Sequence, residues 1–255
     1  MNEAVSFIDA AIPLIKEIRE KEMGNIMNAA SIIADSLAKG GILHLFGVSH
    51  SLNILQEVHQ RKGGLIPTSI IFDPAQYQFL WTAYFEHQEG YAKPLVAQYD
   101  IREGEPLIVC SNSGINPLPV EVAIEAKKKG AKIIAITSMK DTMSHESRLS
   151  NGKKLYQVAD VVIDNHAPEN DLLIEIEGLQ DKVVAPSGIL GVAVAQEIVT
   201  QTIQVMQNKG HQPPVSISTY RKDARKYRMR IIEKYNDRAW KLTGHPLVND
   251  GRRGG

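Results

Sequence analysis

Residues 106–138 of this chain, PLIVCSNSGINPLPVEVAIEAKKKGAKIIAITS, decide its fold. The stretch begins with a short apolar run at 107–110 and ends with another at 132–137. Continuous apolar runs of this length are typical of strands buried on both faces of a sheet. Between them, residues 117–129 carry apolar side chains at helical spacing and stop at Gly130, which is a helix-end signal. The stretch therefore predicts a parallel βαβ unit, and such units bind ligands beyond the carboxyl ends of their strands.

The turn between the first strand and the helix, Ser111–Gly114, is rich in hydroxyl and amide groups. Asn116 has the residue type of an N-cap, which places Pro117 and Pro119 in the first turn of the helix. Because proline has no N–H, this helix start offers fewer backbone donors than a P-loop. An anion here would be bound largely by the side chains of the turn, which suits a phosphate or a polyhydroxylated ligand. On residue types alone, a purely structural turn explains the segment equally well.

Apolar runs at 42–46, 65–72 and 161–163 predict three more strands. Pro67 lies within the second run, which favours a position at the edge of the sheet. Before the first strand, the stripe of apolar residues over 2–38 predicts two helices separated near Gly24. The other helices are predicted over 75–99, with a break near Gly90, over 187–208, and as a basic amphipathic helix over 219–242.

Five segments in order resemble the signatures of the SIS (sugar isomerase) domain, whose members bind phosphosugars. They are GGILHLFGVSHS (40–51), SNSG (111–114), AKIIAITS (131–138), ADVVIDN (159–165) and PSGILGVAVAQEIV (186–199). In detail the chain resembles a stand-alone branch of the family that is similar to the phosphoheptose isomerases. The resemblance implies an α/β fold, a three-layer sandwich around a central parallel, flavodoxin-like sheet, with helical extensions at both ends.

The expected organisation has three parts. Residues 1–39 form N-terminal helices that cover the domain or a partner subunit, 40–215 form the phosphosugar-binding domain, and 216–255 form the basic helix and a tail. SIS proteins commonly dimerise through such helices, so the resemblance implies a homodimer or homotetramer.

Composition limits the partners. The 29 lysines and arginines balance the 29 aspartates and glutamates, so no overall charge favours binding to nucleic acid or to an acidic membrane. The single cysteine, Cys110, excludes an internal disulfide framework and fits a reducing compartment. We expect neither a secretory leader nor a membrane span. These observations predict a cytoplasmic protein.

The helix expected after the first strand, at about 51–62, carries the candidate base. His50, Asn53 and Glu57 share one polar face, because residues three and four apart are neighbours on a helix. The SIS branch that the chain resembles also has a glutamate at the position of Glu57. Glu86, which clusters with His87 and Glu89, and Glu197 are the alternative candidates for the base.

The resemblance to the SIS family implies an aldose–ketose isomerase for a sugar with an anionic terminal group, a 6-phosphate in the first place or a 6-sulfonate, and the residues of the chain suggest which groups would act. Glu57 would move the proton through an enediol, and His50, titratable near neutrality, would open the sugar ring. No metal or other cofactor is expected, because the histidines lack the spacing of a zinc site. The substrate would be held by Ser49, Ser51, Ser111, Asn112, Ser113, Gly114, Thr137, Ser138 and Ser187.

Two other functions remain open. A sugar-phosphate sensor without catalysis would share the same binding residues, since SIS modules often serve as sensors next to helix-turn-helix domains. The 40 residues before the first strand are short and weakly basic for such a domain. A lyase or etherase acting on an amino-sugar phosphate would remove the same proton, so only the product separates it from an isomerase.

Overall fold

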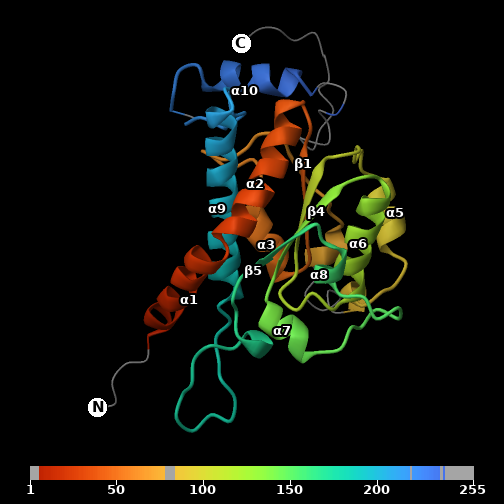
Figure 1. Ribbon diagram of the computed structural model, residues 1–255, viewed down its shortest axis with the longest axis vertical. Helices are drawn as coiled ribbons and strands as arrows, with labels where there is room; N and C mark the ends of the chain where they lie inside the picture. Colours follow the sequence, from red (N-terminus) through yellow and green to blue (C-terminus); the bar gives the residue numbers. More distant parts are fainter. Residues whose placement is uncertain (1–5, 78–83, 219, 236–237, 239–255) are drawn as a thin grey trace.

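The centre of the molecule is a parallel sheet of five strands in the order β2-β1-β3-β4-β5 (Figure 1). The computed structural model describes residues 6–77, 84–218, 220–235 and 238. The chain adds β2 on one side of β1 and β3 on the other, which is the order of flavodoxin-like sheets. This confirms the predicted fold class. The strands are β1 (Leu43–Gly47), β2 (Thr68–Ile70), β3 (Pro106–Cys110), β4 (Lys132–Thr137) and β5 (Val161–Asp164).

Helices cover both faces of this sheet. Because side chains alternate along a strand, Ile108 and Cys110 of β3 point into one core, and Leu107 and Val109 point into the other. The first core is closed by α1 (Phe7–Lys21), α2 (Met23–Ala38), α3 (His50–Gln56) and α9 (Ser187–Asn208). The second is closed by α5 (Ala92–Ala97), α6 (Pro117–Lys128) and α8 (Leu155–Val158). Shorter elements are η1 (Pro74–Tyr77), α7 (Met139–Ser144) and η2 (Glu169–Asp171).

The longest helix, α9, lies in the core. It packs against α2 and α3, and a Cβ at Gly191 would come within 2.5 Å of Cδ1 of Ile54. By length and composition α9 is apolar enough to cross a membrane, but half of its most apolar stretch is buried inside the protein. Packing against α2 and α3 therefore accounts for the buried half of that stretch.

The two N-terminal helices meet at Glu22, not at Gly24 as predicted. Glu22 is 7% exposed, and its carboxylate accepts hydrogen bonds from the side chain of Asn25 and from the backbone N–H of Asp164. A tertiary contact therefore sets the position of the bend, which the residue types of the two helices do not encode. The helix α1 continues through Pro13.

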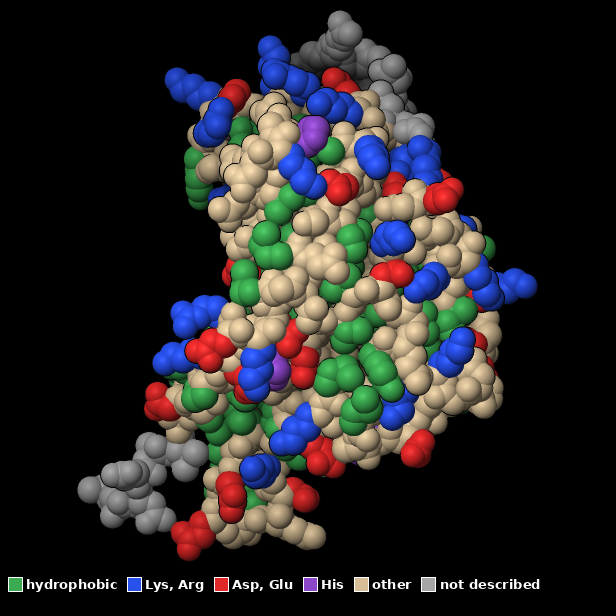
Figure 2. All heavy atoms as spheres, viewed as in Figure 1, with side chains coloured by type: hydrophobic (Ala, Val, Ile, Leu, Met, Phe, Trp, Pro, Cys, Tyr) green, Lys and Arg blue, Asp and Glu red, His purple; other side chains and the backbone are tan. Residues whose placement is uncertain are grey.

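The C-terminal helix α10 (Ala224–Glu233) crosses the end of the molecule where the strands begin (Figure 1). Its Ile231 and Ile232 pack on Ile42 and Ile66. Lysine and arginine side chains gather on the surface around this helix (Figure 2). The helix is shorter than the predicted 219–242, of which residues 219, 236–237 and 239–242 lie outside the described residues.

A buried ion pair attaches the chain after α10 to the sheet. Arg238 is 3% exposed, and its Nη1 lies 2.5 Å from Oε1 of Glu105. Nε2 of His44 lies 3.0 Å from the other oxygen of Glu105. Burial raises the pKa of Glu105, but the bonds from His44, Arg238 and the backbone N–H of Arg102 outweigh it and lower the pKa to about 2. His44 is therefore a hydrogen-bonded core histidine.

Candidate functional site

A cavity of about 610 Å³ opens where the strand order reverses, beyond the carboxyl ends of β1 and β3. This is where parallel sheets bind ligands. Its wall comes from six parts of the chain. They are residues 48–51 after β1, 86 before α5, 111–113 and 115 after β3, 141–148 within and after α7, 170–171 after β5, and 187 at the start of α9.

The turn after β1 is tight. A Cβ on Gly47 would lie 2.8 Å from the backbone carbonyl of Ser51, so only glycine lets α3 begin this close to the strand. Ser49 has φ of 55°, a left-handed conformation that glycine adopts more readily. Strained non-glycine residues of this kind gather at functional sites. Oγ of Ser49 lies 3.2 Å from Nδ1 of His50, and both residues line the cavity.

The Ser111–Gly114 turn is held from behind. Gly114 has φ of 61°, and a Cβ there would lie 2.9 Å from Oγ1 of Thr137. The hydroxyl of Thr137 donates to the carbonyl of Asn112 at 3.0 Å, and that of Thr142 donates to the carbonyl of Ser113 at 2.7 Å. These bonds fix the backbone, so that Ser111, Asn112 and Ser113 line the cavity.

The side chain of Asn112 is oriented by two neighbours. Its Oδ1 accepts a hydrogen bond from Nδ2 of Asn165 at 3.0 Å, and its Nδ2 donates to Asp141 at 3.3 Å. Asp141 also accepts the backbone N–H of Asn170 at 2.8 Å. The ends of β3, β4 and β5 are thereby joined around the cavity.

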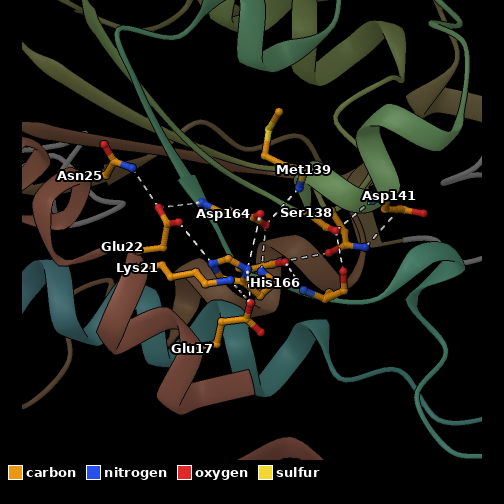
Figure 3. A network of polar contacts seen from close by, with 12 residues as sticks. Glu17, Lys21, Glu22, Asn25, Ser138, Met139, Asp141, Asp164 and His166 are labelled. Atoms are coloured by element: carbon orange, nitrogen blue, oxygen red, sulfur yellow. Dashed lines mark hydrogen bonds and ion pairs between the residues drawn. The ribbon is translucent and has the colours of Figure 1, made fainter. Parts of the chain in front are cut away.

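A network of charged groups supports this edge from the side of the N-terminal helices (Figure 3). Nε2 of His166 lies 3.2 Å from Glu22, and Nδ1 lies 3.6 Å from both Glu17 and Asp164. Asp164 in turn accepts the backbone N–H groups of Met139 and His166. The network therefore ties α1 and α2 to the segments that follow β4 and β5.

Glu86 is the half-buried carboxylate of the cavity wall. Its Oε1 accepts a hydrogen bond from Nδ2 of Asn116 at 2.5 Å. Burial raises the pKa of Glu86 above its ordinary value, although Asn116, His87 and Arg148 act in the opposite direction. A raised pKa is what a carboxylate needs to accept a proton and to release it again near neutral pH.

Arg148 brings a positive charge to the same wall. Its Nη1 donates to Oδ1 of Asn116 at 2.9 Å and lies 2.8 Å from Nε2 of His87. Among the described residues that line the cavity, Arg148 is the one lysine or arginine. It is therefore suited to bind an anionic group of a ligand.

A second carboxylate, Asp171, faces the start of α9. It accepts the hydroxyl of Ser187 at 2.5 Å and the backbone N–H of Ser187 at 3.0 Å. Burial, with a smaller contribution from Asp141, raises the pKa of Asp171. Asn170 and Asp171 both have left-handed backbones, with φ of 58° and 56°, so this loop is strained at the cavity.

Glu57 lies outside the cavity of its own chain. The helix α3 ends at Gln56, and the carboxylate of Glu57 is 42% exposed and pairs with Nη1 of Arg61 at 2.5 Å. The helical face predicted from the sequence states the direction in which Glu57 points, but not how far the residue lies from the cavity. Seven residues rise about 10 Å along a helix axis, which separates Glu57 from the end of α3 that meets the cavity. Glu197 bonds to Gln201 and also lies outside the lining.

Thr137 and Ser138 differ from the prediction as well. Both are fully buried and lie outside the lining of the cavity. The hydroxyl of Ser138 donates to the carbonyl of Ala167 at 2.7 Å and accepts the N–H of Asp141. Their hydroxyls hold the turns in place instead of facing a ligand. Gly114 also lies outside the lining. Its lack of a side chain allows the turn to pack closely against Thr137.

The structure brings seven of the predicted residues together and adds others. The seven are Ser49, His50, Ser51, Ser111, Asn112, Ser113 and Ser187. Those that the sequence interpretation missed are Asp141, His145, Glu146, Arg148, Asn170 and Asp171. A usable signal is that all six follow the ends of β4 and β5, where a parallel sheet places its ligand-binding loops. Within the described part of the chain, no group of three histidine, cysteine or acidic residues is placed to hold a metal ion.

Comparison with known proteins agrees with this fold. Residues 6–138 match the family model of the SIS domain. A UPF0309 protein of Listeria monocytogenes serovar 1/2a is 34% identical over 238 residues, covering 93% of this chain and 99% of that protein. A UPF0309 protein of Geobacillus sp. strain WCH70 is 36% identical over 230 residues, covering 89% and 93%. The structure of phosphoheptose isomerase from Neisseria gonorrhoeae aligns with a TM-score of 0.54 at 16% identity, over 77% of this chain and 95% of that one.

Proposed function

The chain belongs to the SIS domain family, and from this premise we propose that it is an aldose–ketose isomerase. Its substrate would be a sugar with an anionic terminal group, a 6-phosphate in the first place and a 6-sulfonate in the second. One observation carries the proposal. The half-buried carboxylate of Glu86 faces the same cavity as two serine-rich turns, His50 and the guanidinium of Arg148. The phosphoheptose isomerase that shares the fold is consistent with this reaction class.

The reaction assigns a distinct step to each group. Glu86 removes the proton from C2 of the open-chain aldose, and the electrons of the C–H bond form the C1–C2 double bond of an enediol while His50 gives one proton to the carbonyl oxygen at C1. Glu86 then returns its proton to C1 and the C2 hydroxyl gives its proton back to His50, which yields the ketose with no net gain or loss of protons. A carboxylate with a raised pKa suits both directions of this transfer.

Substrate binding is divided between the two walls of the cavity. Arg148 and the hydroxyls and amides of the Ser111–Ser113 turn would hold the anionic group. Asp171 and Asp141 are acceptors suited to sugar hydroxyls. His50, within the cavity at the start of α3, would transfer the proton that opens the ring.

Glu57 remains the alternative base through a different geometry. Its carboxylate is partly exposed, so it would have to act in the cavity of a second copy of the chain. The exposed side chains of Ile8 and Ile12 on α1, 68% and 41% exposed, offer a face that a second copy would cover, and we propose a homodimer on this basis. Sedimentation of the wild type and of an Ile8→Glu, Ile12→Glu variant tests the dimer, which should dissociate in the variant.

Proton exchange in D₂O tests the proposed reaction. The protein is incubated with a panel of sugar 6-phosphates and 6-sulfonates, and deuterium at C2 is followed by proton NMR. Exchange together with ketose formation supports the isomerase. Tight binding without exchange in every sugar would favour a sensor, and loss of a substituent from the sugar would favour a lyase. The Glu86→Gln variant should lose the exchange.

A further inference from the structure

Asn116 occupies an N-cap position but does not cap its helix. It directly precedes α6 and has an extended backbone, with φ of −76° and ψ of 145°, yet its side chain makes no bond to the helix start. The residues before α1 and α7 behave differently, because the side chains of Ser6 and Ser138 each accept an N–H from the first turn.

The prolines of α6 explain why the side chain of Asn116 is released. A capping oxygen accepts the N–H of the second or third helical residue. The third residue here is Pro119, which has no N–H. One of the two possible donors is therefore missing. A capping hydrogen bond from Asn116 would stabilise this helix less than usual, so the amide can bond elsewhere at little cost in stability.

The released amide bridges two groups of the cavity. Its Nδ2 donates to Glu86 at 2.5 Å and its Oδ1 accepts from Nη1 of Arg148 at 2.9 Å. Asn116 is 7% exposed, so these bonds are made away from bulk water. The guanidinium of Arg148 can only donate, which fixes Oδ1 toward Arg148 and leaves Nδ2 pointing at Glu86. The orientation of the amide is thus set by chemistry.

We infer that Asn116 is a positioning residue. Its bond from Arg148 orients the amide so that an N–H donates to Glu86, and this hydrogen bond favours the ionised, proton-accepting form of the carboxylate. The inference rests on the proposed function, since it gives Glu86 the role of the base. A half-buried carboxylate loses hydration, and one strong donor offsets part of that loss.

Other charged groups also face this carboxylate, so each effect of substitution at Asn116 is measured between two proteins that share those groups. His87 and Arg148 act on Glu86 directly. The remaining titratable groups of the cavity wall are His50, Asp141, His145, Glu146 and Asp171. None of them is changed by substitution at Asn116, so a shift in the titration of Glu86 would report on the bridging amide.

Titration of Glu86 by carbon-13 NMR tests the inference without any substrate. The carboxyl signal is assigned by its loss in Glu86→Gln and followed in the full chain. In Asn116→Ser the apparent pKa of Glu86 should rise by about one to two units, the size expected for one lost hydrogen bond to a charged group. Asn116→Asp should raise it further, because it replaces the donor with a negative charge. Serine and aspartate are both good N-caps, so neither change weakens the helix start.

Two controls separate positioning from a structural role. Asn53→Ser makes the same chemical change on the exposed side of α3 and should leave the titration of Glu86 unchanged. Arg148→Met frees the amide to rotate, so a second substitution, Asn116→Ser, should then shift the pKa by less than it does alone. An unchanged titration in Asn116→Ser, in a variant that melts like the wild type, would overturn the inference.

The exchange reaction supplies an independent readout. If Glu86 is the base, the acid limb of the pH–rate profile in Asn116→Ser should move upward together with its titration. A limb that stays in place while the titration moves would overturn the role of Asn116 in catalysis. Absence of exchange in the wild type would instead overturn the proposed function, and the titration would still decide whether Asn116 holds the carboxylate.

Discussion

Glu57, just after α3, and Glu86, before α5, are both candidates for the base, and the surroundings of their carboxylates differ. Glu57 is partly exposed and forms an ion pair with Arg61, four residues further along the chain. Glu86 is half buried, lines the cavity, and bonds to the side chain of Asn116 from a distant part of the sequence. The first environment can be read from residue spacing, and the second cannot.

The comparison shows that a position on the polar face of a helix does not by itself make a carboxylate part of a catalytic site. Periodicity states which way Glu57 points, but a carboxylate becomes a base only where enclosure and partners adjust its proton affinity. Glu86 meets these conditions because Glu86, Asn116 and Arg148, three residues far apart in sequence, come together at the wall of the cavity.

The largest expected effect distinguishes the two glutamates by activity. Glu86→Gln should reduce the rate of C2 proton exchange by about 10²–10⁴-fold, the usual contribution of a positioned general base. Glu57→Gln should change it by less than about threefold, because the carboxylate is already solvated and outside the cavity. Both rates are measured by proton NMR in D₂O on one sugar 6-phosphate. The reverse result would transfer the role of base to Glu57 in the cavity of a second copy.

The next effect compares the arginines beside the two glutamates. Arg148→Met should weaken binding of fructose 6-phosphate by about 10–100-fold, since hydrogen bonds to charged groups contribute about 1.5–3 kcal/mol. Arg61→Met removes the same charge beside Glu57 and serves as the matched control. Calorimetry with fructose 6-phosphate and with uncharged fructose separates the charge from the sugar. Equal losses in the two variants would mean that the anion is not bound by Arg148.

The strands were predictable because buried parallel strands are short, continuous apolar runs, whereas their flavodoxin-like arrangement was implied by the resemblance to the SIS family. The run at 42–46 corresponds to Leu43–Gly47, and Pro67 directly precedes the edge strand Thr68–Ile70. Membership of the SIS family was also predictable, because the motifs occur in the expected order. The matches to the SIS family model and to UPF0309 proteins confirm it. The bend at Glu22 was not predictable, because Glu22 makes its contacts there with Asp164 and His166, at the end of β5 and far away in the sequence.

The site was predictable only where it follows directly from a strand end. Two of the turns come just after strands, Ser111–Ser113 after β3 and Ser49–Ser51 after β1. Their place at the cavity therefore follows from the topology. Thr137 and Ser138 also lie at a strand end, yet their hydroxyls donate to the backbone carbonyls of Asn112 and Ala167. Which way a hydroxyl turns depends on the loop packed behind it, and one sequence does not specify that loop.

A smaller effect concerns the cost of enclosing Glu86. Burial raises the pKa of its folded state above the ordinary value of 4.5, so the ionised carboxylate destabilises the fold at neutral pH. Relative to wild type, Glu86→Gln should therefore raise the melting temperature by on the order of 2 °C at pH 7–8. The difference should shrink as the pH falls and vanish below 4.5, where the folded and unfolded glutamate are both protonated. Calorimetric scans at several pH values measure it, and a difference that grew toward low pH would contradict the assigned burial.

The smallest effect concerns the surface pair at the end of α3. Exposed i,i+4 pairs contribute about 0.3–0.5 kcal/mol, and salt screens them. Glu57→Gln should therefore lower the free energy of unfolding by no more than about 0.5 kcal/mol in urea at low salt, with most of the loss absent in 1 M NaCl. Arg61→Gln should give the same loss, and the double variant should be no worse than either single one. A loss several times larger, dependent on protein concentration and insensitive to salt, would show that Glu57 is buried against a second copy. That result would make the two glutamates alike in enclosure and would reopen the choice of base between them.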